Sequence, residues 1–156
     1  MGIELSDGEV WAFTERAHTG ILTTLRRDGR PVSLPLWFVA FEGSIHFSTP
    51  SRSKKIARAR HDSRACFLVE SGLAWRELKA VTMTGSVEVV EDADLALRVA
   101  SELDRKYRDF RPDLTRAPGA TRRRYGSGSA TLRFTPASWI SWDNAKIRFA
   151  KPEATA

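Results

Sequence analysis

The chain has 156 residues, 42% of them hydrophobic and 28% charged, which fits one globular domain with a real core. Its 25 lysines and arginines against 19 acidic residues give a formal charge of +6. That charge favours an anionic partner, such as a phosphorylated cofactor, a nucleic acid or an acidic membrane surface. No apolar run approaches the roughly 20 residues of a membrane span, and the N-terminus has no signal-peptide pattern. The lone cysteine, Cys66, can form no internal disulfide, so we expect a cytoplasmic protein without a membrane partner.

The pattern of apolar residues, turns and caps predicts a mainly β domain with flanking helices. In chain order it predicts a helix over about 7–18, strands over 20–25, 32–41 and 45–49, a short helix over 52–61, strands over 64–71 and 78–92, a helix over 92–107 and a last strand over 130–142. Ser6 and Glu9 have capping-box spacing ahead of the first helix. Asp28-Gly29 is typical of a hairpin tip, and Pro35 cannot donate a ladder hydrogen bond within the second strand.

Several interruptions of this pattern also carry structural information. Gly85 lies within the long fifth strand and indicates a β-bulge or a close approach of two backbones. The sequence predicts an irregular segment over residues 108–129, with a short helix near 118–124, and a frayed tail over residues 151–156. Tight turns make the early strands antiparallel. Six strands in a single domain over residues 1–150 tend to curl into a barrel, because closure removes exposed edges.

A run of small hydroxylated residues leads directly into positive charge at the start of the predicted helix 52–61. The run consists of Ser48, Thr49, Ser51 and Ser53, and it is followed by Lys54 and Lys55. A phosphate is held by backbone N–H groups at a helix start, by hydroxyl groups and by a cationic counter-charge, and this stretch supplies all three. The alternative is a solvated basic helix face, and the pattern alone leaves both open.

Longer stretches of the sequence resemble a known family. The segments "TGILTTLRRDGRPVSLPLWFV", "GSIHFSTPSRSKKIARARHDSRACFLVE" and "GSVEVVED" are similar to the pyridoxamine 5′-phosphate oxidase-like split β-barrel family. The similarity is strongest to its branch of F420-dependent flavin/deazaflavin oxidoreductases and runs from about Leu5 to Lys146. The most specific match is an S-x-K block followed by D-x-R-A, at Ser53, Lys55 and 62–65. The resemblance implies an antiparallel six-stranded split β-barrel with flanking helices.

The resemblance also implies a cofactor site shared between two subunits of a homodimer. In the family the basic elbow holds the cofactor phosphate and the second strand lies along the redox ring. Trp139, Trp142 and Lys146 fall in the matching C-terminal strand, which the resemblance places toward the ring or the substrate. The residues in matching positions are Ser33, Pro35, Leu36, Trp37, Phe38, Ser48, Thr49, Ser53, Lys54, Lys55, Arg58 and Trp142. Arg52 and Arg60 add charge at the elbow, and Lys146 follows the C-terminal strand.

One departure from the family bears on the choice of cofactor. The flavin-using oxidases carry an R-x-V-x-L-K-like block on the second strand, whereas "RPVSLPLW" at 30–37 has no lysine. The missing lysine favours the deazaflavin coenzyme F420 over FMN as the cofactor, and the phosphate and glutamate tail of F420 suit a basic chain. The implied function is hydride transfer between reduced F420 and a small unsaturated acceptor, such as an enone, quinone or tetrapyrrole. The alternatives are an oxidoreductase with FMN in the same fold and a non-catalytic F420 carrier.

Other functional classes find less support in the sequence. His18, His46 and His61 are scattered without metal-ligand spacing, so we expect no metal site and identify no catalytic residue. A nucleic-acid binder would need interleaved aromatic residues or a helix-turn-helix pattern, and neither is found. The basic stretch "TRRR" at 121–124 either clamps an anionic tail or is solvated, and the sequence leaves that choice open.

Overall fold

The computed structural model describes residues 2–126 and 128–149, so the predicted tail at 151–156 lies outside the described residues. Its helices are α1 (Asp7–Arg16), α2 (Lys54–His61), α3 (Ala93–Tyr107) and α4 (Gly119–Gly126). Its strands are β1 (Gly20–Leu25), β2 (Pro31–Leu36), β3 (Val39–Phe41), β4 (Ser44–Pro50), β5 (Arg64–Ser71), β6 (Lys79–Val90) and β7 (Ser129–Asp143). No described helix is long and apolar enough to cross a membrane.

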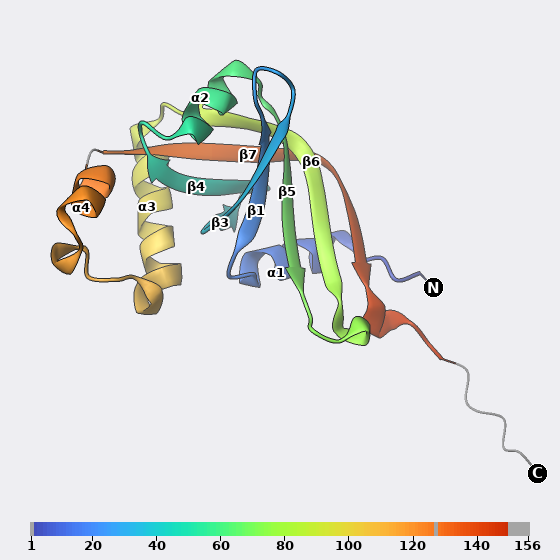
Figure 1. Ribbon diagram of the computed structural model, residues 1–156. Helices are drawn as coiled ribbons and strands as arrows, with labels where there is room; N and C mark the ends of the chain where they lie inside the picture. Colours follow the sequence, from blue (N-terminus) through green and yellow to red (C-terminus); the bar gives the residue numbers. More distant parts are fainter. Residues whose placement is uncertain (1, 127, 150–156) are drawn as a thin grey trace, which may run out of the picture.

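The strands form one antiparallel sheet in the order β2-β1-β5-β6-β7-β4-β3. β2 and β3 follow each other in the chain but lie at opposite edges of this sheet, and only Trp37 and Phe38 separate them. Because two residues span less than about 8 Å, the sheet must curl until its edges meet. The result is the split-barrel shape visible in Figure 1, which confirms the predicted fold class.

The predicted strand count needs a correction, because residues 32–41 form two strands instead of one and the total is seven. The break has an identifiable cause in Tyr107, at the end of α3. The Tyr107 hydroxyl accepts a hydrogen bond from the Phe38 N–H at 3.0 Å and lies 2.9 Å from the carbonyl oxygens of Phe38 and His18. The backbone of Phe38 is therefore satisfied by a side chain instead of by a neighbouring strand, and the chain turns there.

Two local predictions from the sequence are confirmed. The Ser6 hydroxyl accepts from the Glu9 N–H at 3.4 Å while the Glu9 carboxylate accepts from the Ser6 N–H at 2.8 Å, which is a capping box. The register of β6 on β7 shifts between Thr84 and Gly85, which is the predicted bulge. A Cβ atom on Gly85 would lie 2.1 Å from the Thr135 carbonyl oxygen, so only glycine permits this approach.

The concave face of the sheet carries the core. Aromatic and aliphatic side chains from β1, β4, β5, β6 and β7 meet Ile56 and Ala59 of α2 and Val10 of α1. A second cluster joins α3 to the short strand β3 through Val39 and Tyr107. Burial of these apolar side chains holds α2 against the concave side. α3 packs on the opposite face of β3, because Val39 contacts α3 whereas its neighbour Ala40 faces the core.

Away from α3, the convex face formed by β1, β2, β5 and the adjoining parts of β6 and β7 is partly open to solvent. The strand pairings place eleven small or apolar residues on it, and all are half-exposed or exposed: Ile21, Thr23, Ser33, Pro35, Cys66, Leu68, Thr82, Thr84, Ser138, Ile140 and Trp142. Ile140 is 67% exposed. The exposed side chains of Arg64 and Glu70 share this face, toward the two ends of β5. The rest of it is largely uncharged, which is unusual for a surface in contact with water alone.

Candidate functional site

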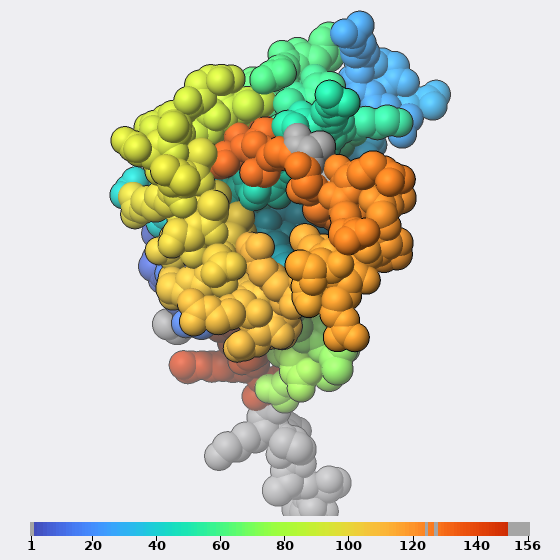
Figure 2. Space-filling model, turned by 90° about the vertical axis from the view of Figure 1, so that its left-hand side faces the viewer, coloured from blue at the N-terminus to red at the C-terminus, as the bar shows by residue number. Residues whose placement is uncertain are grey.

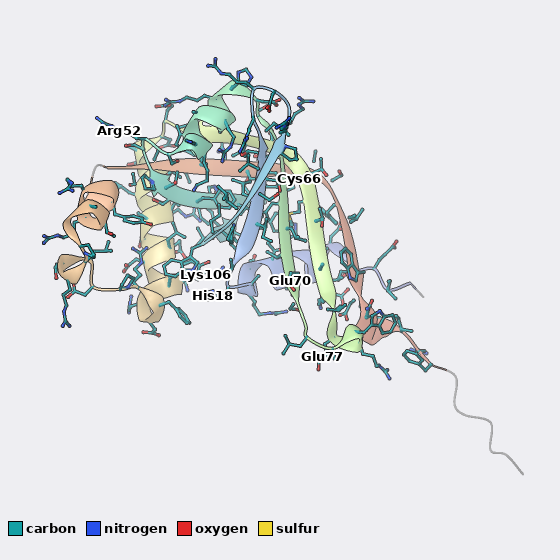
Figure 3. All side chains as sticks on the ribbon, viewed as in Figure 1. His18, Arg52, Cys66, Glu70, Glu77 and Lys106 are labelled. Atoms are coloured by element: carbon teal, nitrogen blue, oxygen red, sulfur yellow. The ribbon has the colours of Figure 1, made fainter. Side chains whose placement is uncertain are left out.

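A groove of about 760 Å³ lies at the start of α2, between the β1–β2 hairpin and α4. It is lined by Arg26, Val32, Leu34, Pro50, Arg52, Ser53, Lys54, Lys55, Arg58, Ala120 and Arg123. Six of these side chains are cationic and none is acidic. We call this the basic groove. Figure 2 looks onto the side where α3 and α4 frame a hollow in the surface, and Figure 3 shows Arg52 at the start of α2, above α4.

The chain entering α2 is held by a short series of hydrogen bonds. The Ser51 N–H donates to the Gly128 carbonyl at 3.1 Å, and the Ser53 N–H donates to the Pro50 carbonyl at 2.9 Å. The Thr49 hydroxyl donates to the Ser53 hydroxyl at 3.2 Å, and Ser53 makes no side-chain capping bond to the helix. Ser53, the N-cap residue of α2, thus gives the helix no side-chain cap beside a cationic groove, and a helix start of this kind is a favourable position for an anion.

Arg58 provides the clearest sign that the basic groove fits an anion. Its Nε donates to the Thr24 hydroxyl at 2.8 Å, which fixes the guanidinium against β1. Its Nη2 is buried and has no hydrogen-bond partner among the described residues. Burial and the neighbouring charge of Arg26 lower the pKa of the Arg58 guanidinium. A buried donor that lacks a partner is costly, and a phosphate oxygen would satisfy it.

The elbow residues predicted to bind the cofactor lie at or next to the basic groove. Ser53, Lys54, Lys55 and Arg58 line it. Thr49 is buried beneath Ser53 and supports it, whereas Ser48 is exposed on β4. Arg60, which the sequence offered as extra charge, lines no part of the groove and lies 3.9 Å from Glu91. Cofactor binding by these residues stays a prediction.

The residues predicted on the second strand divide between two faces. Leu36 packs against the core, whereas Ser33 and Pro35 lie on the convex face, where the Ser33 and Thr23 hydroxyls are 2.8 Å apart. Trp37 stacks on Tyr107 with ring centroids 4.5 Å apart. The Phe38 side chain is completely buried, and its backbone is engaged by Tyr107, so the structure does not bring Phe38 to the basic groove.

The C-terminal residues singled out from the sequence lie far from the basic groove of the same chain. Thr131 of β7 pairs with Ser48 near the start of α2, whereas Trp142 pairs with Ala80 at the other end of the strand. At roughly 3.3 Å per residue, the path along the strand between these two positions is about 36 Å. The Lys146 ammonium donates to the Glu9 carboxylate at 2.8 Å, and this hydrogen bond lowers the pKa of Glu9 to about 2. Lys146 thus ties the C-terminal strand to α1.

Sequence reasoning missed the contribution of the hairpin and underrated α4. Arg26 and Val32 flank the β1–β2 turn, and Ala120 and Arg123 lie on α4. Of these, only Arg123 had a signal in the sequence, through the basic stretch 121–124. No group of three or more metal-ligating side chains comes together in residues 2–126 and 128–149.

A curled antiparallel sheet with a basic groove at the start of a short helix defines a split β-barrel protein. Comparison with family models makes the assignment specific. Residues 6–143 match the family described as pyridoxamine 5′-phosphate oxidase, and the chain belongs to that family. No curated protein sequence matched the chain.

Solved structures with similar folds include proteins with different cofactors. A conserved hypothetical protein of Mycobacterium tuberculosis, Rv2991, is 25% identical with a TM-score of 0.78, over 97% of this chain and 96% of its own. An FAD-binding protein of Mesorhizobium loti is 20% identical with a TM-score of 0.67, over 88% and 94% of the two chains. An F420 reductase is 20% identical with a TM-score of 0.63, over 86% and 98%. These similarities support the fold and leave the cofactor open.

Proposed function

We propose that this chain is an F420-dependent oxidoreductase that holds the coenzyme phosphate in the basic groove. The observation that carries the proposal is the set of six cationic side chains without an acid, together with the buried Arg58 Nη2 that lacks a partner. When bound, the coenzyme would supply the hydride chemistry, transferring two electrons to or from a small unsaturated acceptor. The acceptor classes remain enones, quinones and tetrapyrroles.

The residues of the chain would bind the coenzyme and keep water from it. Lys54, Lys55 and Arg58 would neutralise the phosphate beside the first turn of α2. Val32 and Leu34 provide an apolar wall next to it. β2 is an edge strand that pairs only with β1, so alternate backbone groups face away from the sheet. Those groups would hydrogen-bond the polar edge of the ring, except at Pro31 and Pro35, which have no N–H.

FMN-dependent oxidoreduction and F420 storage are the two alternatives. FMN carries one phosphate, and six cationic side chains exceed what one phosphate needs. A carrier would bind the coenzyme at the same groove and show no turnover. We favour F420 because the cationic surface extends beyond the first turn of α2 to the hairpin and α4.

Titration of tryptophan fluorescence with F420 and with FMN tests the proposal. The chain has five tryptophans, so a ring bound near any of them should quench emission. We expect tighter binding of F420 than of FMN, and oxidation of reduced F420 in the presence of at least one enone, quinone or tetrapyrrole. Tighter binding of FMN would favour the flavin alternative. F420 binding without turnover of any acceptor would favour the carrier.

We also propose that two chains associate through the largely uncharged part of the convex face. This would bring Ser33, Pro35 and Trp142, which lie outside the basic groove of their own chain, to a shared surface. It would also explain why Ile140 is 67% exposed in the single chain. A cytoplasmic location is part of the proposal and rests on the lone cysteine.

Ile140→Asp should convert the dimer to a monomer without unfolding the chain. Ile140 is exposed, so the monomer loses little packing, whereas two buried carboxylates at a twofold interface would cost several kcal/mol. Light scattering coupled to gel filtration measures the mass, and circular dichroism checks the fold. Leu97→Asp, at an exposed position on α3, is the matched control and should remain dimeric. A monomeric wild-type chain would contradict the proposal.

A further inference from the structure

A second cavity, of about 410 Å³, adjoins the basic groove. Arg26, Lys54 and Arg58 line both spaces, so the two are contiguous through these side chains. Arg27 of the β1–β2 hairpin and His61 at the end of α2 line only the second cavity. The mechanism proposed above uses the groove and leaves this second space without a role.

The second cavity concentrates positive charge that no carboxylate neutralises. Its lining contains four lysine or arginine side chains and no acid. Among the residues that the structure describes, none of these four forms an ion pair. Neighbouring cations differ in this respect, because Arg30 lies 3.8 Å from Asp28 and Arg60 lies 3.9 Å from Glu91. Asp62, which follows His61, pairs with Arg64 at 2.8 Å. These three acids are thus directed to cations outside the two cavities.

The shared side chains explain how the two spaces would act together. Arg26 and Arg58 are close enough for the charge of one to lower the pKa of the other, so their guanidinium groups repel. Thr24 fixes Arg58 from one side only, and its Nη2 has no partner among the described residues. An anion on either side of this pair relieves the repulsion, and anions on both sides relieve it further.

We propose that the second cavity binds a second anionic group of an elongated ligand whose first anionic group occupies the basic groove. The identity of that ligand rests on the proposed function. For F420 the two groups would be the phosphate and a carboxylate of the glutamate tail. FMN has a single phosphate and would leave the second cavity without an anion. The second cavity would therefore distinguish a coenzyme with an anionic tail from one without it.

Arg27→Ala tests the proposal, because Arg27 is exposed on the hairpin and lines only the second cavity. We expect it to weaken F420 binding about tenfold, the loss of one charge-assisted contact, and to change FMN binding less than about twofold. Arg30→Ala removes the same charge from the same hairpin but lines neither cavity, so it should change neither affinity. Lys55 lines the groove and not the second cavity, so Lys55→Ala should weaken the binding of both coenzymes.

The outcomes separate this inference from the proposed function. Suppose that Lys55→Ala weakens the binding of both coenzymes, whereas Arg27→Ala either leaves both affinities unchanged or lowers them equally. The second cavity is then not a tail site, while the groove remains the phosphate site. If the wild-type chain binds neither coenzyme, the proposed function fails, and titration with orthophosphate and tripolyphosphate decides the inference. Arg27→Ala should then reduce the preference for tripolyphosphate about tenfold, and an unchanged preference overturns the inference.

Discussion

Lys55→Ala should weaken binding of the phosphorylated coenzyme by roughly 1.5–3 kcal/mol, which is about 10-fold to 150-fold in Kd. Lys55 lines the basic groove at the first turn of α2, where the helix dipole and the amide groups already favour an anion. The loss is that of a charge-assisted hydrogen bond to phosphate. Isothermal titration with F420 and with FMN measures it directly.

The fold should survive this change, and a neighbouring arginine provides the control. Lys55 is only partly buried, whereas Ile56 and Ala59 carry the packing of α2 on the core. Arg60→Ala removes an equal charge from the same helix, but Arg60 faces Glu91 and lines no part of the groove. We expect Arg60→Ala to keep wild-type affinity. Equal weakening by both variants would indicate a general electrostatic attraction to a basic helix, and unchanged affinity in Lys55→Ala would reject the phosphate position.

Local signals in the sequence were sufficient for most of the elements. The Ser6–Glu9 capping box and the bulge at Gly85 depend on neighbouring residues or on a single glycine, and both are confirmed. The run of hydroxylated and basic residues also predicted where the groove would lie, because all of its components fall within a few positions. Patterns of this kind can be recognised from the sequence because the interacting residues are close together along the chain.

The sequence could not show the features that depend on distant partners. The break between β2 and β3 requires Tyr107, which lies 69 residues beyond Phe38. The apolar run 32–41 reads as one strand because nothing local marks the turn. Likewise, the contribution of Arg123 depends on how α4 packs against the start of α2, and the distance between Trp142 and the groove depends on the length of β7. A resemblance to a family identifies residues of matching type, but it does not show on which face of a strand those residues lie.

The stability of the chain should fall as the pH drops from about 6.5 to about 4, because His46 must stay neutral in the folded state. His46 is 2% exposed on β4, stacks on Phe41 with centroids 4.2 Å apart, and its Nδ1 has no partner among the described residues. Burial, and then the charge of Arg133, lower the pKa of His46 from its ordinary 6.5 to about 4, although Glu42 acts in the opposite direction and Arg98 adds a smaller lowering effect.

The sign follows from the number of protons bound in each state. Between pH 4 and 6.5 the unfolded chain holds a proton on His46 and the folded chain does not, so acidification favours unfolding. The full loss is about 3 kcal/mol, and about 2 kcal/mol of it should be lost between pH 7 and pH 5. Urea denaturation at these two pH values measures the difference. The pKa values of Glu9 and Asp62 are lowered to about 2 from ordinary values of 4.5 and 3.8. These two carboxylates therefore contribute to acid sensitivity mainly below about pH 5, outside the range compared by urea denaturation.

His46→Phe separates the titration from the packing. The variant keeps an aromatic ring against Phe41 and has no proton to gain, so its stability should be nearly the same at pH 7 and pH 5 whatever its absolute value. His61→Gln, at an exposed position on α2, should keep the wild-type slope. If His46→Phe retained the full slope, another group would be responsible. A flat wild-type profile would mean that His46 takes up its proton without unfolding, which its buried position between Phe41 and the sheet makes costly.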